Sequence, residues 1–490
     1  MKAPVMRKTR AARAIPPCAM ALGLMLAGCA VGPNYVRPST PISPTFKEAA
    51  GWTPAAPADA LDRGDWWSLF NDPALNALEA RVKVSNQNVA AAEAAYRQAR
   101  ALVSQQQAAL FPTVSLSGTG TRSGSKGGGG GTVIVNPDGS TNGGAGGGTR
   151  STYRASLGAS WEPDVWGRVR RAVEGAKASA QASQADLAAA TLSAQGELAT
   201  DYFGLRESDV EMALDQATVD GYARSLQVTQ NRFNAGTIPH SDLLQSQTQL
   251  LSAKADLAAT RQQRATYEHA IAVLVGEAPG NFSLPAQPTW TPTLPAIPVG
   301  LPSTLLQRRP DIAGAERRMA NANAQIGVQR AAYFPSFTLS GSYGFASSDL
   351  GSLFNASNSL WSYGLSIAET LFDAGARHAR VAQAKAAYDQ TVAQYRETVL
   401  TAFQGVENQL TASQVQAEEY ELRRQASLAA DQAETMVNNR YQAGQVSFIE
   451  LFTAQNTAFT ARRALAQAGA QRQSTAVALI QALGGGWRAP

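Results

Sequence analysis

The chain has 490 residues, of which 16% are charged and 7% aromatic, and its formal net charge is +5. This positive excess does not indicate a nucleic-acid-binding protein, because residues 1–28 carry five basic side chains and no acidic one, so the remainder of the chain is close to neutral. The only two cysteines, Cys18 and Cys29, lie near the N-terminus, which excludes a disulfide framework or a cysteine metal site in the folded body.

The N-terminus resembles the signal of a bacterial lipoprotein. A basic opening is followed by an apolar run over residues 19–27, too short to cross a bilayer as a helix, and then by Gly28 and Cys29. The resemblance implies a signal peptide over residues 1–28 and a covalent lipid on Cys29; a signal peptide without lipidation is the alternative. Because Ala30 is not an aspartate, the rule for retention at the inner membrane is not met, and we expect delivery to the outer membrane.

A helix and two strands are predicted next. Residues 71–110 are rich in Ala, Gln, Glu and Arg, which favours one helix, and Pro112 ends it because the residue before a proline is pushed toward extended conformations. Apolar and small polar residues then alternate over 113–117 and again over 153–161, which predicts two strands. The glycine-rich stretch 124–148 between them lacks a following Gly-Lys-Ser or Gly-Lys-Thr, so we expect an extracellular loop and not a phosphate-binding loop.

A long helix and a reversal follow the second strand. The proline-free run over residues 166–231 predicts one helix of about 100 Å at 1.5 Å per residue. Its apolar residues recur every three or four positions in a narrow stripe, which is typical of a helix that packs sideways against neighbours. The run ends in an Asn-Arg-Phe-Asn-Ala-Gly motif, where Gly236 can adopt the left-handed conformation that ends a helix.

The remaining chain repeats this order of elements. The turn motif at 231–236 returns at 439–444, a shift of 208 positions, and the strand motif at 111–118 returns at 334–341. The second copy adds two more alternating strands. We therefore predict the following segments: a signal peptide over 1–28, a lipidated N-terminal segment over 29–70, a first structural repeat over 71–276, a proline-rich connector over 277–304, a second structural repeat over 305–483 and a C-terminal tail over 484–490.

Four strands per chain predict an oligomer. Open strand edges leave backbone N–H and C=O groups unsatisfied in a membrane, so copies must close a barrel of eight strands in a dimer or twelve in a trimer. Only twelve strands leave room for a water-filled lumen, which favours the trimer. Aromatic residues flank the strands at their helical ends, as expected for a membrane-interface girdle. They are Phe111, Trp161, Trp166, Tyr333, Phe334 and Phe372.

Three further motifs point to one family. They are residues 29–35 (CAVGPNY), 66–75 (WWSLFNDPAL) and 301–312 (LPSTLLQRRPDI). With the duplicated turn they resemble the TolC-like outer-membrane factor family, in its lipidated branch of the OprM and NodT type. The resemblance implies an α+β membrane protein in which a homotrimeric, twelve-stranded transmembrane β-barrel continues into a long periplasmic α-helical barrel. It also implies a periplasmic adaptor (membrane fusion) protein and an inner-membrane pump as partners.

The same resemblance implies that the two turns form a periplasmic tip that closes at rest. The residues concerned are Arg232, Gly236 and Asp242 in the first repeat and Arg440, Gly444 and Glu450 in the second. In a trimer, Asp242 and Glu450 would place six carboxylates near the axis and favour cations. The alternative is that both acids stabilise the first turn of the following helix. Arg232 and Arg440 could bridge neighbouring helices, or interact with the dipole at a helix C-terminus.

No site for enzyme chemistry is predicted. His240, His269 and His378 are isolated and lack metal-ligand spacing, and no catalytic constellation or cofactor motif stands out. We expect a passive conduit for small molecules such as drugs, which forms the outer-membrane part of a tripartite efflux pump and binds no nucleic acid. The alternatives are an outer-membrane conduit for type I protein secretion, and a coiled-coil lipoprotein that spans the envelope without forming a channel.

Overall fold

The computed structural model describes residues 30–39, 45–47, 65–124, 134–135, 141–142, 149–295, 297 and 308–485. The predicted signal peptide, Cys29, most of the glycine-rich loop, and residues 296 and 298–307 of the predicted connector lie outside this part of the chain. The chain divides into two compact units, each assembled from three segments. Unit 1 comprises residues 1–36, 101–177 and 320–389, and unit 2 comprises residues 37–100, 178–319 and 390–490.

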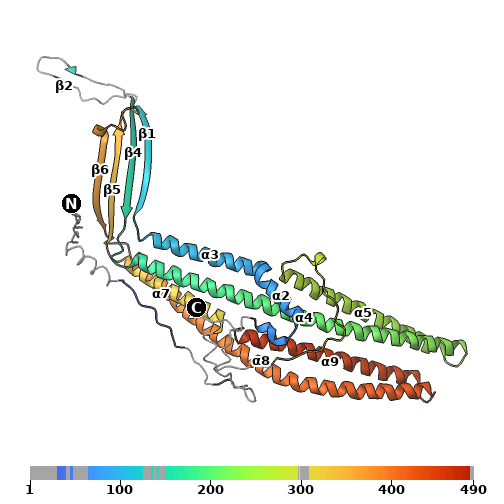
Figure 1. Ribbon diagram of the computed structural model, residues 1–490. Helices are drawn as coiled ribbons and strands as arrows, with labels where there is room; N and C mark the ends of the chain where they lie inside the picture. The colour runs from blue at the N-terminus through green and yellow to red at the C-terminus, as the bar shows by residue number, and fades with distance from the viewer. Residues whose placement is uncertain are drawn as a thin grey trace, which may run out of the picture. The chain divides into compact units, whose positions relative to one another are not determined.

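Unit 1 contains a four-stranded antiparallel sheet in the order β1-β4-β5-β6 (Figure 1). The strands are β1 (Thr113–Gly124), β4 (Thr149–Trp161), β5 (Ser336–Ser347) and β6 (Ser359–Ala368). A separate two-stranded ladder joins β2 (Ile134–Val135) to β3 (Thr141–Asn142), and a short 3-10 helix, η4 (Ala356–Asn358), precedes β6. The four alternating strands predicted from the sequence are thus confirmed.

The strand register separates the sheet into two chemically different faces. Leu116 pairs with Leu157, Leu157 with Tyr343, and Tyr343 with Trp361, so one apolar row crosses all four strands. The rows on the opposite face run mainly through small polar residues. Examples are the pairs Ser160–Ser340 and Ser342–Ser362. Because side chains alternate along a strand, one face of the sheet is apolar and the other is dominated by Ser, Thr, Gly and Ala.

The long helices occur as two matching pairs. In the first repeat they are α4 (Arg168–Asn234) and α5 (His240–Leu274), with 67 and 35 residues. In the second they are α8 (Ala376–Gln442) and α9 (Phe448–Ala482), again with 67 and 35 residues. Every boundary in the second pair lies 208 positions after its counterpart, the same shift that relates the turn motifs in the sequence.

The single helix expected over residues 71–110 is wrong in one respect, because the structure divides it. It consists of α2 (Pro73–Ser85) and α3 (Gln87–Ala108), separated by the extended backbone of Asn86. The Asn86 side-chain oxygen accepts the N–H groups of Asn88 and Val89, and its amide donates to the carbonyl of Leu274. Asn86 therefore caps a new helix and cannot continue the previous one. In the second repeat, α7 (Pro310–Ala331) precedes the strands.

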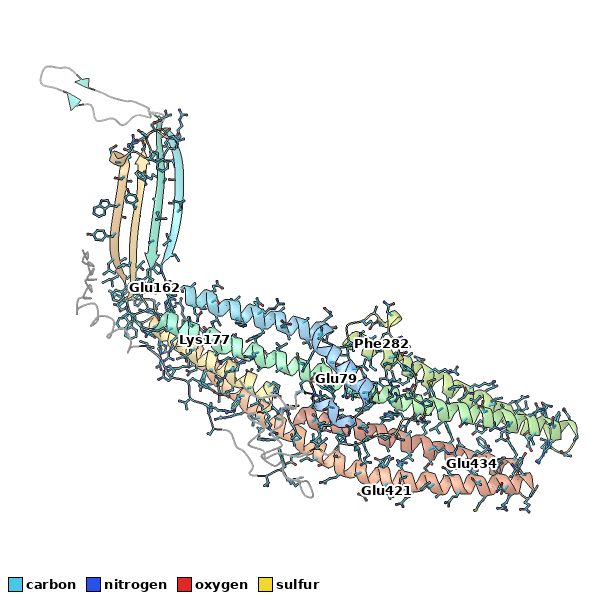
Figure 2. All side chains as sticks on the ribbon, in the orientation of Figure 1. Glu79, Glu162, Lys177, Phe282, Glu421 and Glu434 are labelled. Carbon is cyan, nitrogen blue, oxygen red and sulfur yellow. The ribbon has the colours of Figure 1, made fainter. Side chains whose placement is uncertain are left out.

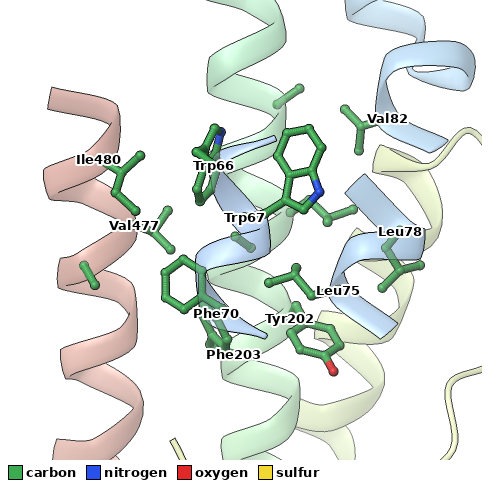
Figure 3. Packing of buried hydrophobic residues seen from close by; sticks show 14 of the residues in the cluster. Trp66, Trp67, Phe70, Leu75, Leu78, Val82, Tyr202, Phe203, Val477 and Ile480 are labelled. Atoms are coloured by element: carbon green, nitrogen blue, oxygen red, sulfur yellow. The ribbon is translucent and has the colours of Figure 1, made fainter. Parts of the chain in front are cut away.

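The main hydrophobic core of unit 2 forms around an N-terminal segment. The 3-10 helix η2 (Trp66–Phe70) inserts Trp66, Trp67 and Phe70 among side chains of α2, α4 and α9 (Figure 3). Tyr202 and Phe203 of α4 and Val477 of α9 belong to the same buried cluster. A short 3-10 helix, η3 (Pro279–Asn281), follows α5. In the described part of the chain, no helix has both the length and the apolar character needed to cross a membrane.

Candidate functional site

The two helix reversals have the same backbone geometry. Gly236 has a φ of 70° and Gly444 a φ of 72°, both in the left-handed region. The N–H of Gly236 donates to the carbonyl of Phe233 (2.8 Å), and the N–H of Thr237 to that of Arg232 (3.0 Å). This pair of bonds is the Schellman motif, which satisfies carbonyls at a helix end. The bonds around Gly444 repeat it at equivalent positions. Gly236 and Gly444 therefore adopt the left-handed conformation that the sequence predicted, and they end α4 and α8.

The first reversal contacts the second through an arginine and a tyrosine. The guanidinium carbon of Arg232 lies 4.7 Å from the centroid of the Tyr441 ring, a cation–π contact that joins the end of α4 to the end of α8. Within each reversal an aromatic residue also faces the start of the returning helix, Phe233 with His240 and Tyr441 with Phe448. Arg440 is exposed. Of the two predicted arginines, the structure thus places Arg232 between helices.

The two acidic residues occupy the first turns of the returning helices. Asp242 is half-buried in α5, and Glu450 is exposed in α9. The Ser447 hydroxyl accepts the backbone N–H of Glu450 and also lies 3.3 Å from its carboxylate. Both positions suit the positive end of a helix dipole, so the stabilising role is compatible with the fold. The acidic ring is a property of an assembly and stays a prediction.

A pocket of about 580 Å³ lies between α4, α8 and α9, beside the Arg232–Tyr441 contact. Arg462 of α9 lines it and forms ion pairs with Asp431 (2.8 Å) and Glu434 (2.7 Å) of α8. Sequence reasoning missed these residues. Arg462 lies 31 positions after Asp431 and 28 after Glu434 in the sequence, so only the reversal between α8 and α9 brings the three charges together.

The six aromatic residues of the predicted girdle all belong to unit 1. Trp166 stacks on Phe334 with ring centroids 4.8 Å apart, and its indole N–H donates to the carbonyl of Pro335 (2.7 Å). The indole of Trp161 donates to the carbonyl of Leu110, and Tyr333 lies beneath the guanidinium of Arg377. The remaining two are strongly exposed: Phe111 at 68% and Phe372 at 86%.

The described residues that directly follow Cys29 belong to unit 1 and pack next to these aromatics. The N–H of Val31 donates to the carbonyl of Trp166 (3.0 Å), and the buried Arg171 donates to the side chain of Asn34 (2.9 Å). Ala30 lies so close to Gly167 that a Cβ added there would be 2.7 Å from the Ala30 Cα. Cys29 itself lies outside the described residues, but its neighbour in the chain is held at the aromatic cluster.

A buried charge network, which sequence reasoning also missed, holds the start of the connector in unit 2. Asp209 of α4 accepts hydrogen bonds from Arg206 and Arg264, both at 2.7 Å, and from the backbone N–H of Gln287 (2.9 Å). Arg206 also donates to the carbonyl of Pro285. Arg206 lies only three positions before Asp209, but Arg264 and Gln287 lie 55 and 78 positions after it, so the local sequence does not reveal the network.

The described residues contain no group of three or more His, Cys, Asp or Glu side chains that could hold a metal ion.

Comparison with known proteins agrees with this architecture. The model of the family described as outer membrane efflux protein matches residues 71–277 and 301–485. A probable efflux pump outer membrane protein of Pseudomonas putida, TtgC, is 31% identical over 467 residues, which cover 94% of each chain. The cation efflux system protein CusC of Escherichia coli is 28% identical, with 96% of this chain and 99% of CusC covered.

Solved structures give the same result. The outer-membrane channel OprN matches with a TM-score of 0.82 and 29% identity, covering 94% of this chain and all of OprN. The open state of the Neisseria gonorrhoeae MtrE outer membrane channel matches with a TM-score of 0.81 and 29% identity, covering 94% and 99%. The family resemblance seen in the sequence motifs is confirmed, and the assignment to the lipidated branch stays a prediction. The chain belongs to the outer membrane efflux protein family.

Proposed function

We propose that three copies of this chain form a passive channel that carries small molecules across the outer membrane, as the outer component of a tripartite efflux pump. The channel performs no chemistry and needs no cofactor. Its partners are a periplasmic adaptor and an inner-membrane pump. In support, relatives of this chain are named as outer membrane proteins of efflux pumps for antibiotics and toluene.

The observation that carries the proposal is the open sheet of unit 1. Among the described residues, β1 and β6 each pair with one neighbouring strand, so each has an edge whose backbone groups are unpaired there. In hydrocarbon, unpaired backbone groups cost several kcal/mol each, and a membrane sheet must therefore close into a barrel. Because the four strands are all antiparallel, β1 and β6 run in opposite directions and can pair between copies in the same antiparallel manner.

The number of copies follows from the two faces. The apolar face is exposed, with Leu116 at 80%, Trp361 at 70% and Tyr363 at 83% exposed, and it suits contact with lipid. The Ser- and Gly-rich face suits a water-filled interior. Eight strands enclose little more than their own side chains, whereas twelve leave a lumen, so three copies fit a channel and two do not.

We further propose that Cys29 carries a lipid and that the six aromatics mark the membrane interface. The support is that Val31, two positions after Cys29, donates to the carbonyl of Trp166, whose indole ring stacks on Phe334. Indole groups with bonded N–H and exposed aromatic rings such as Phe372 suit the headgroup region.

The reversals after α4 and α8 are proposed as the periplasmic gate. Three Arg232–Tyr441 contacts, one per copy, would hold neighbouring helix ends together at rest, and Asp242 and Glu450 would set the charge of the opening. Partner proteins would open the gate by separating these helix ends.

The test is conductance in planar bilayers. Purified wild-type protein should give a channel current, and Asp242→Ala combined with Glu450→Ala should lower the preference of that current for cations. Glu421→Ala is the control, because Glu421 is an exposed acid in the interior of α8, far along that helix from the reversal (Figure 2). An unchanged cation preference in the double variant would reject the role proposed for the two acids at the gate; no current from any form would reject the channel.

A further inference from the structure

The charged residues of the sheet are all of one sign. The four strands β1, β4, β5 and β6 contain three arginines, Arg122, Arg150 and Arg154, and no lysine, aspartate or glutamate. All three side chains are exposed, and within the described residues none of them forms an ion pair. A sheet that places arginines on a wet surface without balancing acids creates a local positive potential.

The strand register places two of the three arginines, Arg150 and Arg154, on the face that is dominated by Ser, Thr, Gly and Ala. Arg154 stands opposite Thr119 on β1 and Ala346 on β5, and Arg150 stands opposite Ser123. They are four residues apart on β4, about 13 Å along the strand. Arg122 lies on the opposite, apolar face, which also carries Leu116, and it pairs with Ser151.

Within the described residues, no acidic side chain on the four strands balances the charges of Arg150 and Arg154. Most other residues on this face are Ser, Thr, Gly or Ala, whose side chains end close to the backbone, so the two guanidinium groups reach further from the sheet. The described connection between β5 and β6, at the same end of the sheet, contains one acid, Asp349. Its carboxylate accepts the backbone N–H of Ser352 and stabilises that turn.

We infer that Arg150 and Arg154 form a positively charged belt in the outer part of the lumen, which favours anionic solutes and disfavours cationic ones. The inference rests on the proposed function, because three copies of the sheet must close for six guanidinium groups to face one lumen. Field lines are focused inside a pore with low-dielectric walls, so six unbalanced charges raise the local concentration of anions. The belt would act as a second filter whose sign is opposite to that of the acids at the gate.

The belt can be tested by a local probe. Ala346→Cys places a reporter thiol directly opposite Arg154. In protein reconstituted into liposomes, its modification is timed with an anionic reagent (sulfonatoethyl methanethiosulfonate) and a cationic one (trimethylammonioethyl methanethiosulfonate), with the parent chain as background for Cys18 and Cys29. The ratio of the two rates reports the potential at the thiol and does not depend on the state of the gate.

In the reporter background, Arg150→Gln with Arg154→Gln should lower the ratio of anionic to cationic rate by about fivefold. Arg122→Gln removes the same charge from the other face and should leave the ratio unchanged. About 1 M salt should remove most of the difference, because it shortens the screening length to about 3 Å.

Equal ratios in all variants, with a reporter that reacts readily, would overturn the belt and leave the channel standing. A reporter at 346 that reacts with neither reagent, while one at Phe345→Cys does, would show that the polar face is not the wet one. That result would reject the proposed channel together with the belt.

Discussion

At the scale of single residues, the least expected feature is a carboxyl group buried among apolar side chains. Glu79 of α2 is fully buried, on the same face of the helix as Leu75, Leu78 and Val82 (Figures 2 and 3). Among the residues that the structure describes, neither of its carboxylate oxygens has a hydrogen-bond partner. Burial raises the pKa of this carboxyl to about 9, since the charged form loses its hydration. The side chain is therefore protonated in the folded protein at neutral pH.

This makes the free energy of unfolding dependent on pH in a predictable direction. Between pH 4.5 and 9 the folded chain holds a proton on Glu79 that the unfolded chain has released, so stability falls as pH rises. Glu79→Gln removes this penalty, because the amide does not ionise. We expect the variant to be more stable than wild type by up to about 4 kcal/mol at pH 7.5, and by almost nothing at pH 4.5. Urea denaturation followed by circular dichroism at the two pH values measures both differences.

Glu421→Gln is the matched control for this experiment. Glu421 is exposed, and hydrogen bonds from Arg424 and Gln425 lower the pKa of its carboxyl to about 2. Its replacement should bring no gain in stability at pH 7.5. If the difference in free energy of unfolding between Glu79→Gln and wild type is the same at pH 4.5 and pH 7.5, the protonation assigned to Glu79 is contradicted.

At the scale of elements, local pattern predicted the strands and the long helices because their signals are local. Alternation and Pro112 define β1, and a glycine of positive φ ends α4 and α8. The break at Asn86 was missed because an asparagine within a helix-forming segment is ambiguous until its partner is known. That partner is the carbonyl of Leu274, almost two hundred residues away. The Asp209 network was missed for the same reason.

Two helix-ending glycines allow the cost of backbone strain to be separated from the cost of a clash. Gly236 and Gly276 have similar φ values, 70° and 73°. A Cβ at Gly236 would meet nothing within 4 Å, whereas one at Gly276 would lie 2.3 Å from the carbonyl oxygen of Ser85. Alanine at Gly236 should therefore lower the free energy of unfolding by about 1 kcal/mol, because only the left-handed backbone conformation opposes the substitution.

Alanine at Gly276 should cost at least twice as much, because the backbone of Ser85 must also move. The comparison uses urea denaturation of the two single variants side by side. If both variants lose the same free energy of unfolding, the end of α2 moves to accommodate the added Cβ. The close approach at Gly276 then has no consequence for stability.

At the scale of the whole molecule, the duplication is what made the sequence informative. One shift of 208 positions relates α4 to α8 and α5 to α9, and it also relates Gly236 to Gly444. What the sequence could not reveal is which equivalent residues would differ in their contacts. Arg232 lies over Tyr441, but Arg440 is exposed, although both occupy the same place in the motif. Such differences arise from packing between the repeats, which no local pattern records.

The central claim is that the unpaired edges of β1 and β6 meet between copies and close after three. The most direct measurement is oxidative cross-linking of a chain that carries Ser117→Cys on β1 and, in turn, Ser362→Cys, Gly364→Cys or Ser366→Cys on β6. At least one pair should give a ladder on denaturing gels that ends at three chains, with wild-type chains giving none. A ladder that ends at two, one that continues past three, or monomers alone in every pair would contradict the account.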